Sequence, residues 1–128
     1  MHKKKFFFIV FEGIEGTGKS YQIKKLSNNL KKLGFNLQTT REPGGSKTAE
    51  KIRNLIFSKY ANNFDKITDY YLMNAARNEH VKKTLLLAKK QKKIVITDRF
   101  TDSTYAYQVV ANKIDKKINI MNQTYILK

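Results

Sequence analysis

Apolar residues along this chain recur with two periods, one typical of strands and the other typical of helices. The run Phe-Phe-Phe-Ile-Val-Phe at 6–11 is wholly apolar and predicts a core strand buried on both faces, as in the centre of a parallel sheet. Apolar residues at helical spacing then predict a helix over 18–33, and Gly34 supplies its stop. A strand followed directly by a helix is thus the first unit of the fold.

The remainder of the chain repeats this alternation. Strands are predicted at 35–40 and 93–97, and helices at 47–60, 68–91, 102–110 and 115–127. Thr68 is the predicted N-cap of the long helix. The residues that this helix is expected to bury are Leu72, Ala75, Ala76, Val81, Leu85 and Ala88. Strands alternating with helices imply an α/β fold, a parallel sheet covered by helices, in a single domain over 1–128.

The segment between the first strand and the first helix carries the clearest chemical signal. Residues 13–20 read Gly-Ile-Glu-Gly-Thr-Gly-Lys-Ser, the spacing G-x-x-x-x-G-K-[ST] of a phosphate-binding loop. Glycines let backbone N–H groups point at phosphate oxygens, Lys19 reaches the β- and γ-phosphates, and the Ser20 hydroxyl can ligate Mg²⁺. The predicted triphosphate site comprises Gly13, Ile14, Glu15, Gly16, Thr17, Gly18, Lys19 and Ser20.

Two further polar clusters follow strands. Asp98 could hold Mg²⁺ directly or through water, or cap the next turn, and Arg99 offers a bidentate fork for a phosphate. The sequence Arg-Glu-Pro-Gly-Gly at 41–45 predicts a tight loop that approaches a ligand. Because ligands of parallel sheets bind at the carboxyl ends of the strands, these clusters and the 13–20 loop should converge on one cleft.

Four other charged or titratable side chains leave open alternatives. Glu15 would be repelled by phosphate, so we interpret it as an acceptor for a sugar hydroxyl, the alternative being a solvent-facing loop residue. Arg77 lies beside two alanines and either points into a cleft toward a base edge or reaches solvent from the helix surface. His2 and His80 match no metal-ligand or triad spacing. We expect His2 at a solvated terminus and His80 on a helix surface.

Composition narrows the class of protein. The formal charge of +16 comes from 26 basic and 10 acidic residues, with lysines in pairs on predicted helix faces. This favours solvated helix faces and anionic small substrates over a nucleic-acid or membrane surface. Without cysteine there is no disulfide framework and no thiolate metal site. No stretch reaches transmembrane length and the N-terminal apolar run is too short for a signal peptide, so we expect a cytoplasmic protein.

Three motifs together resemble those of bacterial thymidylate kinases. They are Phe-Glu-Gly-Ile-Glu-Gly-Thr-Gly-Lys-Ser at 11–20, Thr-Arg-Glu-Pro-Gly-Gly at 40–45, and Asp-Arg-Phe-x-x-Ser-x-x-Ala-Tyr-Gln at 98–108. Their order and spacing agree over essentially the whole chain, with Ala-Ala-Arg at 75–77 between them. The resemblance implies a P-loop NTPase fold, the reaction of ATP with dTMP to give ADP and dTDP, Mg²⁺ as cofactor, and a homodimer.

The resemblance also assigns roles by position. Lys19, Asp98 and Arg99 would be the catalytic residues, with Ser20 and Asp98 at the Mg²⁺ and Arg99 on the acceptor phosphate. Glu15 would bond the 3′-hydroxyl, Arg77 would read thymine O4, and Tyr107 would press against C2′ of the sugar. The implied dTMP-binding residues are Glu15, Arg41, Pro43, Met73, Arg77, Arg99, Ser103, Thr104, Tyr107 and Gln108.

Departures from the family pattern keep other functions open. Met73 stands where the family usually has a Phe that stacks on thymine. The chain ends at Lys128, about where relatives begin a fourth core strand, so further strands, the lid and the adenine-binding loop are expected to lie outside these residues. In relatives with Gly at position 16, the lid supplies the catalytic arginine. The alternatives are another P-loop deoxynucleotide kinase or a nucleotide-binding fragment without kinase activity.

Overall fold

Three parallel strands form the sheet in the computed structural model, which describes residues 5–60 and 63–128. They are β1 (Phe7–Phe11), β2 (Leu37–Arg41) and β3 (Ile94–Asp98), in the order β1-β3-β2. Asp98 lies opposite both Phe11 and Arg41 in the register, so all three strands end together. The loops that follow the strands therefore leave from one edge of the sheet.

The central strand is β3, and the expected central position of the 6–11 run was wrong for the described chain. The β3 residues 94–97 are all buried, whereas Phe7 and Val10 of β1 are 48% and 37% exposed. An apolar run shows that a strand suits burial, but it does not determine which strand pairs along both edges. The observed pairing places β3 between its two neighbours, with β1 along one edge and β2 along the other. Phe7 is accordingly no core residue.

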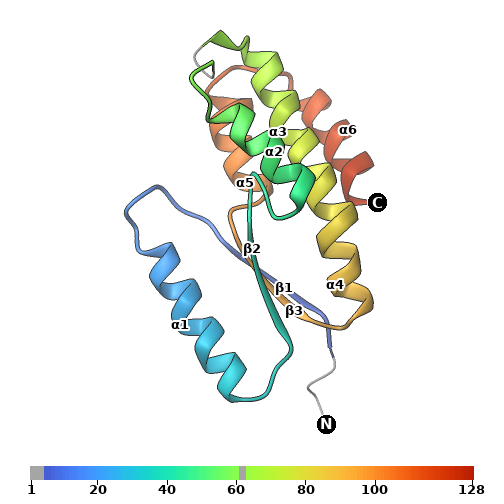
Figure 1. The fold of residues 1–128 in the computed structure, drawn as a ribbon. Coiled ribbons are helices and arrows are strands. Elements are labelled where there is room, and N and C mark those ends of the chain that lie inside the picture. The colour runs from blue at the N-terminus through green and yellow to red at the C-terminus, as the bar shows by residue number, and fades with distance from the viewer. Residues whose placement is uncertain (1–4, 61–62) are drawn as a thin grey trace.

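Helices cover the sheet and extend beyond its carboxyl edge (Figure 1). α1 (Lys19–Lys32) lies on one side and contacts β2 and β3, and Gly34 ends it in a left-handed conformation as expected. The other helices gather on the opposite side and beyond the strand ends. They are α2 (Lys47–Ile56), α3 (Lys66–His80), α4 (Leu86–Lys90), α5 (Thr101–Thr104) and α6 (Lys116–Leu127), with π-helical segments η2 (Val81–Leu85) and η3 (Tyr105–Val110).

The long helix differs from its prediction at three points. It begins at Lys66, because the Asp65 carboxylate accepts a hydrogen bond from the Ile67 N–H at 2.8 Å and caps it, so Thr68 is not the N-cap. Segment η2 interrupts the predicted single helix. Ala75 is exposed, because neighbouring helical positions lie about 100° apart and Ala76 takes the buried position. The expected helix at 102–110 is likewise divided into α5 and η3.

The main apolar cluster lies between the sheet and the helices on the side opposite α1. It consists of Val81, Leu85, Ala88, Val95 and Ile126, against which Phe6, Phe8, Leu86 and Phe100 pack. This cluster anchors β3 directly below its carboxyl end, where Asp98 and Arg99 begin the polar edge. Within the described residues, no helix combines the length and the apolar character that a membrane crossing requires.

Candidate active site

The loop at 13–20 adopts a cradle held by its own hydrogen bonds. Gly16 and Gly18 have φ angles of 78° and 85°, the left-handed conformation that glycine adopts without a Cβ penalty. The Lys19 Nζ donates to the carbonyl oxygens of Gly13 and Ile14, each at 2.9 Å, and the Thr17 hydroxyl donates to Ile14 at 2.8 Å. α1 begins at Lys19 and has no acidic residue in its first turn, so its positive end favours an anion.

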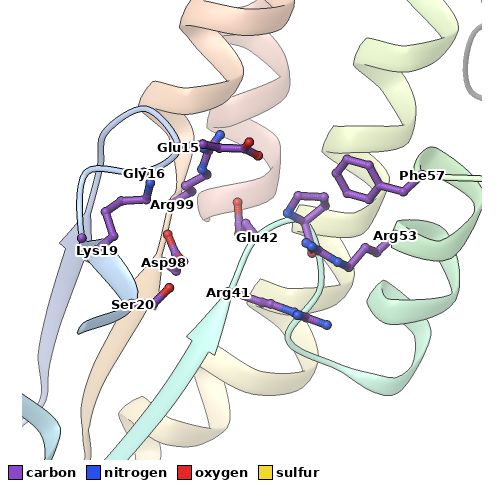
Figure 2. A pocket seen from close by; sticks show the side chains of 12 residues that line it. Glu15, Gly16, Lys19, Ser20, Arg41, Glu42, Arg53, Phe57, Asp98 and Arg99 are labelled. Atoms are coloured by element: carbon purple, nitrogen blue, oxygen red, sulfur yellow. The ribbon is translucent and has the colours of Figure 1, made fainter. Parts of the chain in front are cut away.

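A cavity of about 620 Å³ opens over this loop at the carboxyl edge of the sheet (Figure 2). Its lining comes from all three predicted clusters: Glu15, Gly16, Gly18, Lys19, Ser20, Arg41, Glu42, Pro43, Arg53, Phe57, Asp98 and Arg99. The convergence expected from the parallel topology is therefore confirmed. We call this cavity the phosphate-side cavity, after the loop that forms one wall.

Asp98 and Ser20 both line the phosphate-side cavity. The Oδ1 atom of Asp98 is buried and has no hydrogen-bond partner among the described residues. An unpaired buried carboxylate oxygen next to a hydroxyl oxygen fits a hard cation such as Mg²⁺, which takes oxygen ligands and completes its shell with phosphates and water. The two residues are therefore suited to the metal role predicted for them.

A second cavity of about 610 Å³ adjoins the first, and we call it the base-side cavity because its lining includes Met73 and Arg77, for which contacts with a nucleotide base are predicted. Glu15, Glu42, Pro43, Phe57 and Arg99 line both, so the two are continuous. The further lining residues are Ile56, Asp69, Met73, Arg77, Phe100, Ser103, Tyr107 and Gln108. Eight of the ten predicted dTMP-binding residues line this second cavity, whereas Arg41 faces the phosphate side and Thr104 lines neither cavity.

Arg77 lies in the wall of the base-side cavity and is 1% exposed, which excludes the surface position left open by the sequence. Its Nε donates to the Glu42 carboxylate at 2.7 Å, and its Nη2 donates to the Phe100 carbonyl and the Thr104 hydroxyl at 2.9 and 2.8 Å. Its Nη1 has no partner among the described residues. Thr104 thus supports Arg77 from behind, where the sequence had placed it beside the base.

Gln108, which lines the same cavity, also has a buried polar atom without a partner among the described residues. Its Nε2 donates to the Asp69 carboxylate at 3.4 Å, which fixes the orientation of the amide, because a carboxylate accepts only from the NH₂ side. The Oε1 atom is then buried without a partner in the described part of the chain. Arg77 and Gln108 both line this cavity, and each has one buried polar atom without a partner in the described residues.

The predicted position of His80 on a helix surface was wrong. It is fully buried instead of lying on the helix surface, with Nδ1 2.8 Å from Glu42 Oε1 and Nε2 2.8 Å from Thr40 Oγ1. Glu42 itself is 4% exposed and bridges His80 and Arg77, although only its neighbours Arg41 and Pro43 were expected at the site. The spacing Arg77 to His80 (i, i+3), which places both on one helix face, was the available signal. The other histidine, His2, lies outside the described residues.

A second carboxylate organises the chain after β3. Glu12 accepts hydrogen bonds from the Phe100 N–H at 2.8 Å and from the Ser103 hydroxyl at 2.5 Å. The hydroxyl of Ser103, predicted to bind substrate, is thereby directed to Glu12, although the residue lines the cavity. Arg99, which directly precedes Phe100, has a φ of 69° and places its guanidinium 5.5 Å from the centre of the Tyr107 ring. Glu12 was part of a quoted motif but had no predicted role.

An exposed ion pair borders the phosphate-side cavity. Arg41 Nη2 lies 2.9 Å from Glu50 Oε2, and this hydrogen bond is the main cause that lowers the pKa of Glu50 and raises the pKa of Arg41. Arg53 donates to the Pro43 carbonyl at 2.8 Å and lies 4.8 Å from the centre of the Phe57 ring, and desolvation lowers its pKa. Arg53 and Phe57 lacked a recognisable motif and were not predicted.

Comparison with known proteins decides the family. The family model described as thymidylate kinase matches residues 11–127. The chain belongs to the thymidylate kinase family. It is 41% identical over 121 residues to the thymidylate kinase of Acinetobacter baylyi, covering 93% of this chain and 60% of that protein. It is 45% identical over 113 residues to that of Wolbachia pipientis, covering 87% of this chain and 56% of that protein.

Thymidylate kinase structures also share the fold. The crystal structure of the thymidylate kinase from Ehrlichia chaffeensis aligns with a TM-score of 0.89 at 38% identity, covering 97% of this chain and 70% of that chain. The predicted P-loop fold of parallel strands and covering helices is therefore confirmed. The chain spans 60% and 56% of the length of the curated thymidylate kinases from Acinetobacter baylyi and Wolbachia pipientis.

Proposed function

We propose that this chain forms the nucleotide-binding part of a kinase that transfers the γ-phosphoryl group of ATP to dTMP. The observation that carries the proposal is the pair of continuous cavities, one against a phosphate-binding loop and the other lined by Arg77 and Gln108, each of which has one buried polar atom without a partner among the described residues. In the reaction, an acceptor phosphate oxygen forms a bond to the γ-phosphorus, and the bond to the β–γ bridging oxygen breaks. The products are ADP and dTDP.

The donor side is the loop of residues 13–20. Its backbone N–H groups and the start of α1 would hold the ATP phosphates, and Lys19 would exchange its two loop carbonyls for β- and γ-phosphate oxygens. Ser20 and Asp98 would hold Mg²⁺, directly or through water. When bound, Mg²⁺ neutralises charge on the transferring phosphate.

The acceptor base is the role of Arg77 and Gln108. Thymine presents a carbonyl acceptor at C4 and an N–H donor at N3, which complement the unpaired Nη1 of Arg77 and the unpaired Oε1 of Gln108. Cytosine presents an amino donor and a ring acceptor at these positions, so both contacts would be mismatched. A site whose buried polar groups stay unpaired with the wrong ligand discriminates strongly against it. Met73 lines the same cavity and would cover the base without an aromatic ring.

The sugar and acceptor phosphate fall between the two cavities. Glu15 and Arg99 line both, which suits a bond from the 3′-hydroxyl to Glu15 and a grip of Arg99 on the phosphate. Tyr107 lies against Arg99 and would contact C2′ of the sugar. Neutralising and aligning the two phosphates is the main catalytic task in phosphoryl transfer, so Lys19 and Arg99 would act without covalent chemistry.

Phosphoryl transfer from γ-labelled ATP to dTMP, dUMP, dCMP and dGMP in competition tests the proposal. With a protein that also contains the lid arginine implied by the family resemblance, we expect label in dTDP, at least tenfold less label with dCMP and dGMP, and loss of transfer in Lys19→Met. Comparable turnover of several bases would favour another deoxynucleotide kinase. Nucleotide binding without any transfer would instead identify a binding module. The homodimer and the cytoplasmic location stay predictions, the first of which light scattering in solution tests.

A further inference from the structure

We infer that His80 is a positioning residue, which through Glu42 aims Arg77 at the acceptor base. His80 touches neither cavity and is fully buried. It connects the end of β2 to the loop after it and to the guanidinium in the cavity wall, through the chain Thr40–His80–Glu42–Arg77. The inference rests on the proposed function for its effect on dTMP, although the hydrogen-bond chain itself does not.

The Glu42 carboxylate assigns the hydrogen on Nδ1 of His80. An ionised carboxylate has no proton to donate, so Nδ1 donates to Oε1. When the imidazole is neutral, Nε2 accepts from the Thr40 hydroxyl. With Arg77 positive and Glu42 negative, a neutral His80 leaves this buried cluster without net charge, the arrangement that costs least in a low-dielectric interior.

Each carboxylate oxygen of Glu42 accepts a hydrogen bond from a different side chain. Oε2 receives the Arg77 Nε at 2.7 Å, and Oε1 receives His80 Nδ1 at 2.8 Å. Without the donor on His80, Oε1 would be an unpaired buried oxygen, and the carboxylate would lose the second hydrogen bond that fixes its orientation against Arg77 Nε. The guanidinium would then be held less firmly in the cavity wall. His80 therefore fixes the orientation of the guanidinium through Glu42.

The backbone of the loop after β2 packs against the imidazole of His80. This packing restricts the position of the ring in addition to its hydrogen bonds. Gly45 has a φ of 87°, and a Cβ added there would overlap both the imidazole of His80 and the Thr40 hydroxyl. The Gly45 carbonyl in turn accepts from the Thr84 hydroxyl at 2.6 Å, one helical turn after His80. Ring, loop and helix are thus packed as one unit, so His80 transmits the position of the Arg41–Gly45 loop to Arg77.

Two substitutions at His80 separate positioning from simple filling of space. The amide nitrogen of Asn lies about where His Nδ1 lies, and that of Gln lies about where Nε2 lies, so His80→Asn keeps the donor to Glu42 and His80→Gln loses it. Thr40→Val removes only the hydroxyl group that meets Nε2 of His80 and leaves Nδ1 and Glu42 unchanged. Of these variants it is expected to disturb the folded structure least. Lys82→Gln, on an exposed residue of the next turn, is the control.

Two readouts in the 128-residue chain test the inference. The first is solvent exchange of the Arg77 Nε–H followed by NMR, which needs no nucleotide. We expect exchange at least tenfold faster in His80→Gln and within threefold of wild type in His80→Asn, Thr40→Val and Lys82→Gln. The second is calorimetric titration with dTMP and with ADP. We expect dTMP binding about tenfold weaker in His80→Gln only, and ADP binding unchanged in every variant.

The outcomes separate the inference from the proposed function. Equal exchange in His80→Asn and His80→Gln overturns the positioning role, because only one of them keeps the donor. Equal dTMP affinity in the two variants overturns the effect on the base. If the exchange rates differ as expected but wild type binds no dTMP, the hydrogen-bond chain is supported and the proposed function fails.

Discussion

Substituting Glu42 with Gln would leave a buried arginine without its counter-ion. Both side chains of the Arg77–Glu42 pair are almost fully buried, at 1% and 2% exposure, and their atoms lie 2.7 Å apart. Gln has nearly the volume of Glu, so no cavity forms and the change is electrostatic. Removing one partner of a buried pair costs about 3–5 kcal/mol, because the remaining charge is desolvated and uncompensated.

The Arg41–Glu50 pair provides a matched control in the same chain. It joins the same two residue types at 2.9 Å, but its side chains are 54% and 36% exposed. Exposed pairs contribute about 0–1 kcal/mol, because water and salt screen the charges. Glu50→Gln should therefore cost little, although Glu50 also accepts from the Gly45 N–H at 3.0 Å.

Urea unfolding followed by circular dichroism measures both effects. For a slope of about 1–3 kcal/mol per molar urea, a loss of about 3 kcal/mol lowers the midpoint by about 1–3 M. We expect this shift in Glu42→Gln, with unchanged slope, and a shift of a few tenths molar in Glu50→Gln. If the two variants lose equal stability, or if Glu42→Gln costs less than about 1 kcal/mol, the buried network is not the stabilising feature described above.

Three further substitutions follow from particular contacts. Gly45→Ala should destabilise the chain by about 1–3 kcal/mol more than Gly16→Ala in urea unfolding, because both glycines have positive φ but only at Gly45 would a Cβ meet His80 and Thr40; equal losses would contradict the packing around His80. Met73→Phe should tighten dTMP binding about two- to tenfold in a calorimetric titration, since it adds an aromatic face to the base-side cavity; an unchanged affinity would place the base elsewhere. The pKa of Glu50 lies below its ordinary value of 4.5, so its contribution is present above about pH 4.5 and lost as the pH falls through the lowered pKa. The difference in unfolding free energy between wild type and Glu50→Gln should stay below about 1 kcal/mol and shrink as the pH falls below about 4.5, and a difference that grows as the pH falls would contradict the lowered pKa.

The sequence predicted the phosphate loop and the convergence of clusters, because both depend on local spacing and on parallel topology. Residues 13–20 form a cradle whose glycines adopt the conformations that the motif requires. The position of β1 was not predictable in this way, since an apolar run records burial and not strand order. The N-cap was misplaced by three residues because Asp65 and Thr68 are both capping residues, and only the backbone conformation distinguishes them.

The buried hydrogen-bond network of His80, Glu42, Arg77 and Thr104 was the least predictable part. His80 and Glu42 are 38 residues apart in sequence and meet only through the packing of α3 against the loop after β2. A buried histidine paired with a buried carboxylate has the same local sequence as a solvated one. Thr104 does not line the cavity, and its hydroxyl accepts a hydrogen bond from Arg77. This role is likewise visible only in three dimensions.

Titration of the 128-residue chain with dTMP and dCMP tests the central claim most directly. The account predicts that dTMP binds at least tenfold more tightly, because only thymine pairs with both the unpaired Nη1 of Arg77 and the unpaired Oε1 of Gln108. It also predicts that Arg77→Met abolishes most of this difference. Equal affinities of the wild-type chain for the two nucleotides would contradict the assignment of the base-side cavity.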